Sequence, residues 1–137
     1  MKQIVDAIYT RLGSVTSTGS FHDRVGGRYY HLTGPQNVAF PNCIYSLDGF
    51  ENADQFNGSR ILSGAVTFDI YCEAKDGISV CMDIEEALFT LLDQQNLTVA
   101  SPYGQLAIQC VSRGVPSFND EFVIMTTTYS LFSTRTA

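Results

Sequence analysis

The residues best suited to nucleophilic or metal chemistry are two histidines, His22 and His31, and four cysteines. The cysteines are Cys43, Cys72, Cys81 and Cys110. A histidine beside a cysteine can activate a thiolate, and both residue types bind zinc. No two cysteines have the C-x-x-C spacing of a zinc or thiol-redox motif, and all four fall at expected core positions of strands or of a helix. We therefore expect buried structural thiols, histidines in loops, no metal site and no cofactor.

Carboxylate pairs are the second candidate for chemistry, because two carboxyl groups can act as general acid and base. Asp69 and Glu73 lie on the polar face of an expected strand, and Glu85 and Glu86 are adjacent on an expected helix. Acids on such faces are usually only solvated. The Gly26-Gly27 pair lacks the Lys-Ser/Thr and the following helix of a phosphate-binding loop, so it indicates a turn. The sequence thus predicts no catalytic residue and no enzyme.

Composition places the chain among acidic globular domains. It has 137 residues, a net charge of −6 and a pI of about 4.6. This balance lacks the basic surface of a protein that grips nucleic-acid phosphates. Charged residues make up only 16%, which hints at surface buried against a partner. No apolar run is long enough to cross a bilayer and the first residues do not form a secretory signal, so a cytosolic origin is expected.

Hydrophobic periodicity indicates two helices and four strands. The first helix contains Ile4, Val5, Ile8 and Leu12, and the second runs from an N-cap at Ser79 to Leu92. Between residues 14 and 34 we expect a long loop with a short strand around 28–31. The main strands are expected at 42–47, 66–73, 105–112 and 121–133, and residues 48–61 are expected to form an extended connection. The predicted core comprises Phe68, Ile70, Ile84, Leu88, Leu91, Ile108 and Ile124.

This order of elements predicts the fold class. Two hairpins that bracket a helix indicate an α+β domain with a mostly antiparallel four-stranded sheet and two helices packed on one face. Nothing in the sequence divides the chain, so residues 1–137 are expected to form a single domain.

The last strand carries apolar residues on both faces, which is unusual for a sheet with water on one side. Phe122 and Ile124 mark one face, and Met125, Tyr129 and Leu131 mark the other. We interpret the second set as a subunit interface. The long 48–61 segment adds Phe50, Phe56 and Arg60, which are residue types that anchor protein interfaces. We expect this segment to act as a contact arm.

The chain resembles a family of small phage proteins, the tail terminators and tail-completion proteins of long-tailed phages and gene-transfer particles. The resemblance runs over nearly the whole chain and depends on the order of several weak features. These are the first helix with Ile8, Arg11 and Leu12, the Arg24-Val-Gly-Gly-Arg28-Tyr29 segment, Phe40-Pro41, the strand Val66–Tyr71, Glu86-Ala-Leu88, and Thr127-Thr-Tyr129. The chain departs from many members in its longer 48–61 segment and its four cysteines.

The resemblance implies a subunit of a six-membered ring that caps the tail tube, ends tail elongation and offers a surface for head-tail joining. The implied partners are further copies of the chain, the tail tube protein and a connector or stopper protein, with DNA passing through the ring without specific binding. Arg28 and Tyr29 join the expected interface residues on this basis. The expected location is the virion neck, after assembly in the host cytoplasm. Two alternatives remain open: another neck component such as a stopper or head-completion protein, and a small enzyme or ligand-binding domain with a polar pocket.

Overall fold

The computed structural model describes residues 2–54, 59–100 and 103–136, with the backbone alone described for 50–54, 59–60 and 134–136. Along the chain the elements are α1 (Lys2–Leu12), α2 (Phe21–Val25), β1 (Tyr29–His31), β2 (Asn42–Asp54), β3 (Ser59–Glu73), the 3-10 turn η1 (Ala74–Asp76), α3 (Gly77–Leu92), β4 (Gln95–Thr98), β5 (Tyr103–Phe118) and β6 (Phe122–Thr136). None of the helices in these residues has the length and apolar character needed to cross a bilayer.

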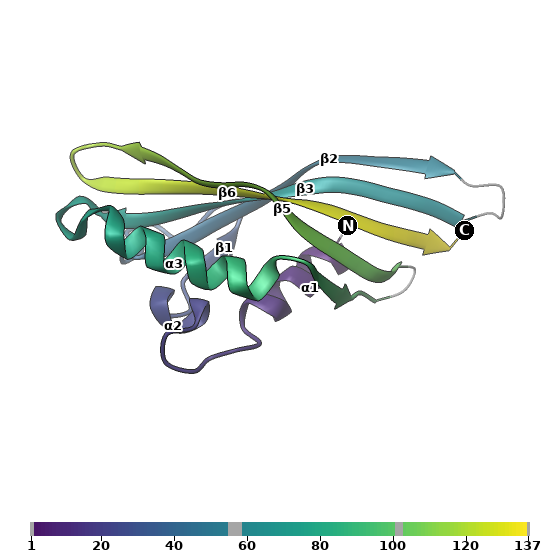
Figure 1. Cartoon of the computed structure of the whole chain (residues 1–137), viewed down its shortest axis with the longest axis horizontal. Coiled ribbons are helices and arrows are strands. Elements are labelled where there is room, and N and C mark those ends of the chain that lie inside the picture. Colours follow the sequence, from purple (N-terminus) through teal and green to yellow (C-terminus); the bar gives the residue numbers. More distant parts are fainter. Residues whose placement is uncertain (1, 55–58, 101–102, 137) are drawn as a thin grey trace.

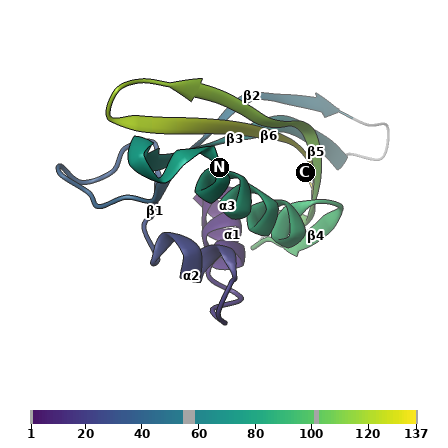
Figure 2. The ribbon, with the colours of Figure 1, turned by 60° about the vertical axis from the view of Figure 1, so that its left-hand side comes forward.

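The strands form one six-stranded mixed sheet in the order β1-β2-β3-β6-β5-β4. Only β1 and β2 pair in parallel, and the other neighbours are antiparallel. The sheet twists strongly and curves over the three helices, which all lie on one side of it (Figures 1 and 2). The predicted mostly antiparallel four-stranded sheet with two helices is therefore wrong. Strand β4 and the short helix α2 were not predicted, and the short strand expected around 28–31 was not counted as part of the sheet.

Helix α3 forms because apolar residues recur every three or four positions and turn one stripe toward the sheet. Its buried residues include Cys81, Ile84, Leu88, Leu91 and Leu92, as the sequence indicated. The helix begins at Gly77, so Ser79 is a helical residue and not the expected N-cap. The Asp93 carboxylate accepts a 2.9 Å hydrogen bond from the Cys110 N–H, which ties the end of the helix to β5.

The long 14–34 segment is partly ordered by a five-residue helix. The Ser20 hydroxyl accepts a hydrogen bond from the Asp23 N–H at the start of α2, and Gly26 ends the helix in the left-handed conformation with φ +60°. The strand expected around 28–31 is present as β1. Capping by residues of the loop itself explains why this helix forms in a stretch without sustained periodicity.

In its described part, the 48–61 segment consists of paired strands and is not a separate extended connection. Residues 48–54 continue β2 and residues 59–61 belong to β3, and the two strands remain paired as far as Asp54↔Arg60. The ends of β2, β3 and β6 extend past the helices (Figure 1). The expected contact arm is thus, in its described part, an extension of the sheet.

The core lies between the sheet and the helices. Six of the seven predicted core residues are buried, from Phe68 and Ile70 in β3 to Ile108 in β5. The exception is Ile124, which lies on the outer face of β6 and is partly exposed. Its neighbours Val123 and Met125 are buried instead. The sequence pattern of β6 had the correct alternation but the wrong inward face.

Candidate assembly surface

The residues expected to do chemistry are held in structural contacts. His22 Nδ1 and the Tyr29 hydroxyl share a 3.1 Å hydrogen bond, and the His31 ring packs 5.4 Å from the ring of Tyr45. Cys43, Cys72 and Cys81 are buried, and Cys110 is partly exposed. Among the residues that the structure describes, no group of three or more histidine, cysteine or acidic side chains is placed to hold a metal ion.

The acidic pair on α3 forms an ion-pair cluster with β5. The Arg113 guanidinium donates to Glu85 Oε1 and Oε2 at 2.8 and 2.9 Å and to Glu86 Oε2 at 2.8 Å. It also lies 3.7 Å from the centre of the Phe89 ring. Hydrogen bonding to Glu85 raises the pKa of Arg113. Because the carboxylates are occupied by a permanent cation, they are poorly placed for proton transfer.

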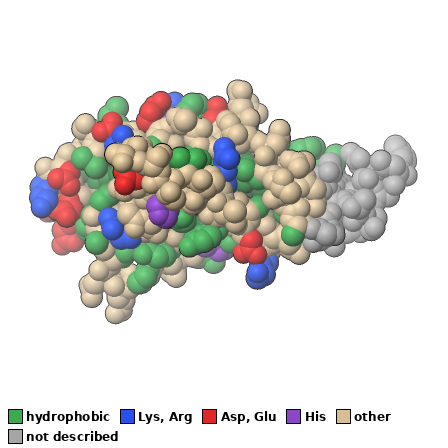
Figure 3. Space-filling model, turned by 90° about the horizontal axis from the view of Figure 1, so that it is seen from below, with side chains coloured by type: hydrophobic (Ala, Val, Ile, Leu, Met, Phe, Trp, Pro, Cys, Tyr) green, Lys and Arg blue, Asp and Glu red, His purple; other side chains and the backbone are tan. Residues whose placement is uncertain are grey.

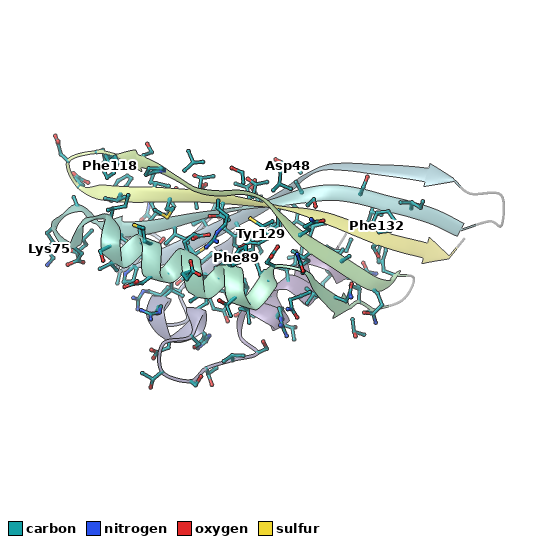
Figure 4. All side chains as sticks on the ribbon, in the orientation of Figure 1. Asp48, Lys75, Phe89, Phe118, Tyr129 and Phe132 are labelled. Atoms are coloured by element: carbon teal, nitrogen blue, oxygen red, sulfur yellow. The ribbon has the colours of Figure 1, made fainter. Side chains whose placement is uncertain are left out.

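Three predicted interface residues lie in the chain's own core. Met125, Tyr129 and Leu131 are 3%, 0% and 2% exposed. Their strand neighbours on β3 explain this, because Tyr129 pairs with Val66 and Met125 with Ile70, and cross-strand partners share a face. Tyr129 lies where β6 crosses above α3 (Figure 4). Their burial within one chain removes the argument that placed a subunit interface at these residues.

The remaining predicted interface residues fall into two groups. Arg28 donates to the carbonyl oxygens of Pro41 and Phe40, and Tyr29 is buried against Tyr9 and Phe21. Both residues hold β1 against the fold. Phe50 and Arg60 belong to β2 and β3, but their side chains lie outside the described part of the structure, as does Phe56 entirely.

An exposed apolar group that the sequence analysis missed lies along β5. Strand β4 covers β5 only from Gln105 to Ile108, so beyond that point the described strands leave the outer side of β5 unpaired. Val111, Val115 and Phe118 on this segment are 66%, 54% and 64% exposed. We call these three residues the β5 apolar edge. Phe118 lies near one end of the sheet, far from Phe132 (Figure 4).

A groove reaches β5 at Arg113 and Gly114, next in sequence to Val115 of the β5 apolar edge. It lies between α3 and the β5–β6 pair and has a volume of about 440 Å³. Ile78, Met82, Arg113 and Met125 are among its lining residues, and Met82 is 54% exposed. The sequence carried a signal for the β5 apolar edge, because apolar residues continue along the strand after Ser112. The signal was missed because Gly114 and Pro116 normally mark the end of a strand.

A hollow of about 500 Å³ between α1 and β4 has no arrangement of free charged side chains that would suit catalysis. Its charged residues are already paired: Asp6 with Lys2 at 2.8 Å, and Arg11 with the Leu91 carbonyl and Gln95. On the helix-side surface the basic side chains are scattered (Figure 3). This distribution does not resemble a phosphate-binding surface.

Comparisons with known proteins give a fold likeness. No family model matches the chain, and no curated protein matches it. One solved structure, the virion of a native gene transfer agent particle, contains a chain that is 15% identical, with a TM-score of 0.70. The match covers 97% of this chain and 96% of that one. A second solved structure contains a chain that is also 15% identical, with a TM-score of 0.63, and the match covers 95% of this chain and 94% of that one. The chain therefore has the same fold as a component of a virion particle.

Proposed function

We propose that this chain is a structural protein of a phage-like particle, without enzymatic activity, that forms a six-membered ring at the tail neck. The observation that carries the proposal is the likeness to a gene transfer agent virion chain over almost the full length of both chains. The match spans nearly the whole chain, which supports a structural role for the domain as a whole. The occupied carboxylates and the scattered basic residues agree with a passive role.

The proposed ring would cap the tail tube, end its elongation and present a surface to the head connector. Each subunit would use one surface to contact a different, complementary surface on the next subunit, as a closed ring requires. Burial of these two surfaces would hold the ring together. A net charge of −6 suits a protein that lets DNA slide past without binding it.

The β5 apolar edge is our candidate for a subunit contact. A neighbouring subunit that runs along this edge would cover three apolar side chains that are each more than half exposed. Strand addition at this edge is disfavoured, because Pro116 has no N–H to donate and the pairing with β6 is irregular between Cys110 and Val115. The neighbour is therefore expected to pack against the side chains of Val111, Val115 and Phe118 and to enter the adjoining groove with Met82.

The solution mass of the purified chain tests this proposal. A ring has a mass several times the 15.1 kDa of one chain, whereas a small ligand-binding domain can remain a monomer. We expect Phe118→Asp to shift the chain to monomer, since a charge in a desolvated contact is costly. Leu32→Asp is the matched control: Leu32 is 61% exposed and follows β1 at the opposite edge of the sheet. A wild-type chain that stays monomeric at every concentration, alone and with tail tubes, would contradict ring formation.

A stopper or head-completion protein is the second candidate, because the same virion likeness fits either neck position. The two roles differ in the tails made without the gene. Loss of a terminator gives tails of uncontrolled length, while loss of a joining protein gives tails of normal length that lack heads.

A further inference from the structure

Two of the four cysteines lie in direct contact inside the core. Cys72 is near the end of β3 and Cys81 is in the second turn of α3, and they are 1% and 0% exposed. Their sulfur atoms are 2.7 Å apart. This is closer than non-bonded heavy atoms normally approach, about 3.5–4.0 Å for carbon, and somewhat longer than a disulfide bond of about 2.05 Å. The fold thus brings two thiols almost to bonding distance.

The other two cysteines offer an internal comparison. Cys43 is fully buried in β2, and Cys110 is partly exposed on β5. In the described part of the chain, the sulfur–sulfur contact is recorded for Cys72 and Cys81 alone. Because burial is similar for Cys43 and for the pair, burial by itself does not set Cys72 and Cys81 apart. Their proximity does.

We infer that Cys72 and Cys81 are a redox-active pair that forms an intramolecular disulfide joining β3 to α3. Nothing in the sequence indicated this pair, since the two cysteines lack a recognised motif spacing and all four cysteines were expected to be structural thiols.

A peroxide is the oxidant that suits the site, because buried sulfurs admit a small molecule more easily than a bulky disulfide. The Cys81 sulfur attacks one oxygen of hydrogen peroxide, giving a sulfenic acid and releasing water. The Cys72 sulfur then attacks the Cys81 sulfur, the S–S bond forms and a second water leaves. Two thiols are oxidised and one peroxide is reduced.

The bond would fasten the start of α3 to the middle of the sheet. Residues 73–80 lie between the two cysteines, so the bond closes a short loop and restricts the unfolded chain. If the chain is a virion protein, a point that rests on the proposed function, the pair would stay reduced in the cell and oxidise after the particle is released. The chemistry of the pair does not depend on that function.

The test is oxidation of the purified chain with stoichiometric hydrogen peroxide, followed by alkylation under denaturing conditions and mass spectrometry. We expect the chain to lose two hydrogens, to keep two alkylatable thiols, and to regain all four after reduction. Trypsin cuts after Lys75, between the paired cysteines, but leaves Cys81 and Cys110 on one peptide. A second cleavage at acidic residues such as Asp83 and Glu86 is therefore needed to locate the bond.

Matched variants separate the pair from the other thiols. Cys43→Ser and Cys110→Ser should leave the disulfide unchanged, and Cys72→Ala and Cys81→Ala should abolish it. Oxidation should raise the melting temperature of the wild-type chain by several degrees and should not raise that of Cys72→Ala. The inference is overturned if four thiols remain after oxidation, or if the bond maps to Cys43 or Cys110. The assay uses the isolated chain, so a failure to form the disulfide would not contradict the proposed function. Conversely, normal particles made without the gene would contradict the proposed function but not the disulfide.

Discussion

Individual side chains on β6 show where sequence reasoning stops. The alternation of apolar residues predicted correctly that Met125, Tyr129 and Leu131 share one face. It could not say which face points inward, because both faces are apolar. That choice depends on the pairing of Tyr129 with Val66 and of Met125 with Ile70, which joins residues far apart in the chain. The burial of α3 was predictable because its polar face is distinct.

Two adjacent residues on β6 test this correction. Leu131 is 2% exposed and Phe132 is 48% exposed. Leu131→Asp should lower the free energy of unfolding by several kcal/mol, because it buries an unpaired charge. Phe132→Asp should change it by less than about 1 kcal/mol. Urea denaturation followed by circular dichroism measures both. A stable Leu131→Asp monomer would restore the interface interpretation of this face.

The Arg113 cluster gives a second test at the residue scale. Glu85 is 6% exposed, so loss of its bidentate partner leaves a buried carboxylate without its cation. Arg113→Ala should cost about 1–3 kcal/mol of unfolding free energy. The control is Lys75→Ala, which removes an exposed pair with Glu73 and should cost nothing measurable. If thermal or urea denaturation gave the same loss of stability for Arg113→Ala and Lys75→Ala, burial of Glu85 would not make its ion pair stronger than an exposed one.

Among the elements, long and strongly patterned segments were predictable and short ones were not. The alternation in β3 and the stripe on α3 are dictated by burial, so the sequence revealed both. The four residues of β4 contain one buried side chain, Leu97, and have no period to detect. Strand β5 continues through Gly114 and Pro116, which normally end a strand. An edge strand tolerates both, because its outer N–H groups need no partner strand.

Helix α3 supplies the prediction at this scale. Leu88 is 0% exposed at the centre of its buried stripe, whereas Met82 on the same helix is 54% exposed. Leu88→Ala should destabilise the domain by about 2–5 kcal/mol through the cavity that it leaves. Met82→Ala should have a much smaller effect on the monomer. Similar losses for the two variants would show that the stripe is not the packed face of the helix.

The shape of the whole molecule follows from the unequal lengths of its parts. Strands β3, β5 and β6 have 15, 16 and 15 residues, while β1 and β4 have three and four. The long strands therefore extend beyond their short neighbours, and the described strands leave the β5 apolar edge unpaired. The low fraction of charged residues hinted at surface buried against a partner. It could not locate the contact surface, which depends on how far β4 reaches along β5.

Electron microscopy of particles made with and without the gene tests the central claim most directly. We expect that deletion gives tails of uncontrolled length, that the wild-type gene restores uniform tails, and that a Phe118→Asp copy does not. A Leu32→Asp copy should restore them, since Leu32 lies away from the β5 apolar edge. Tails of normal length without heads would instead indicate a joining role at the neck. Normal, complete and infectious particles from the deletion strain would contradict a structural role for this chain.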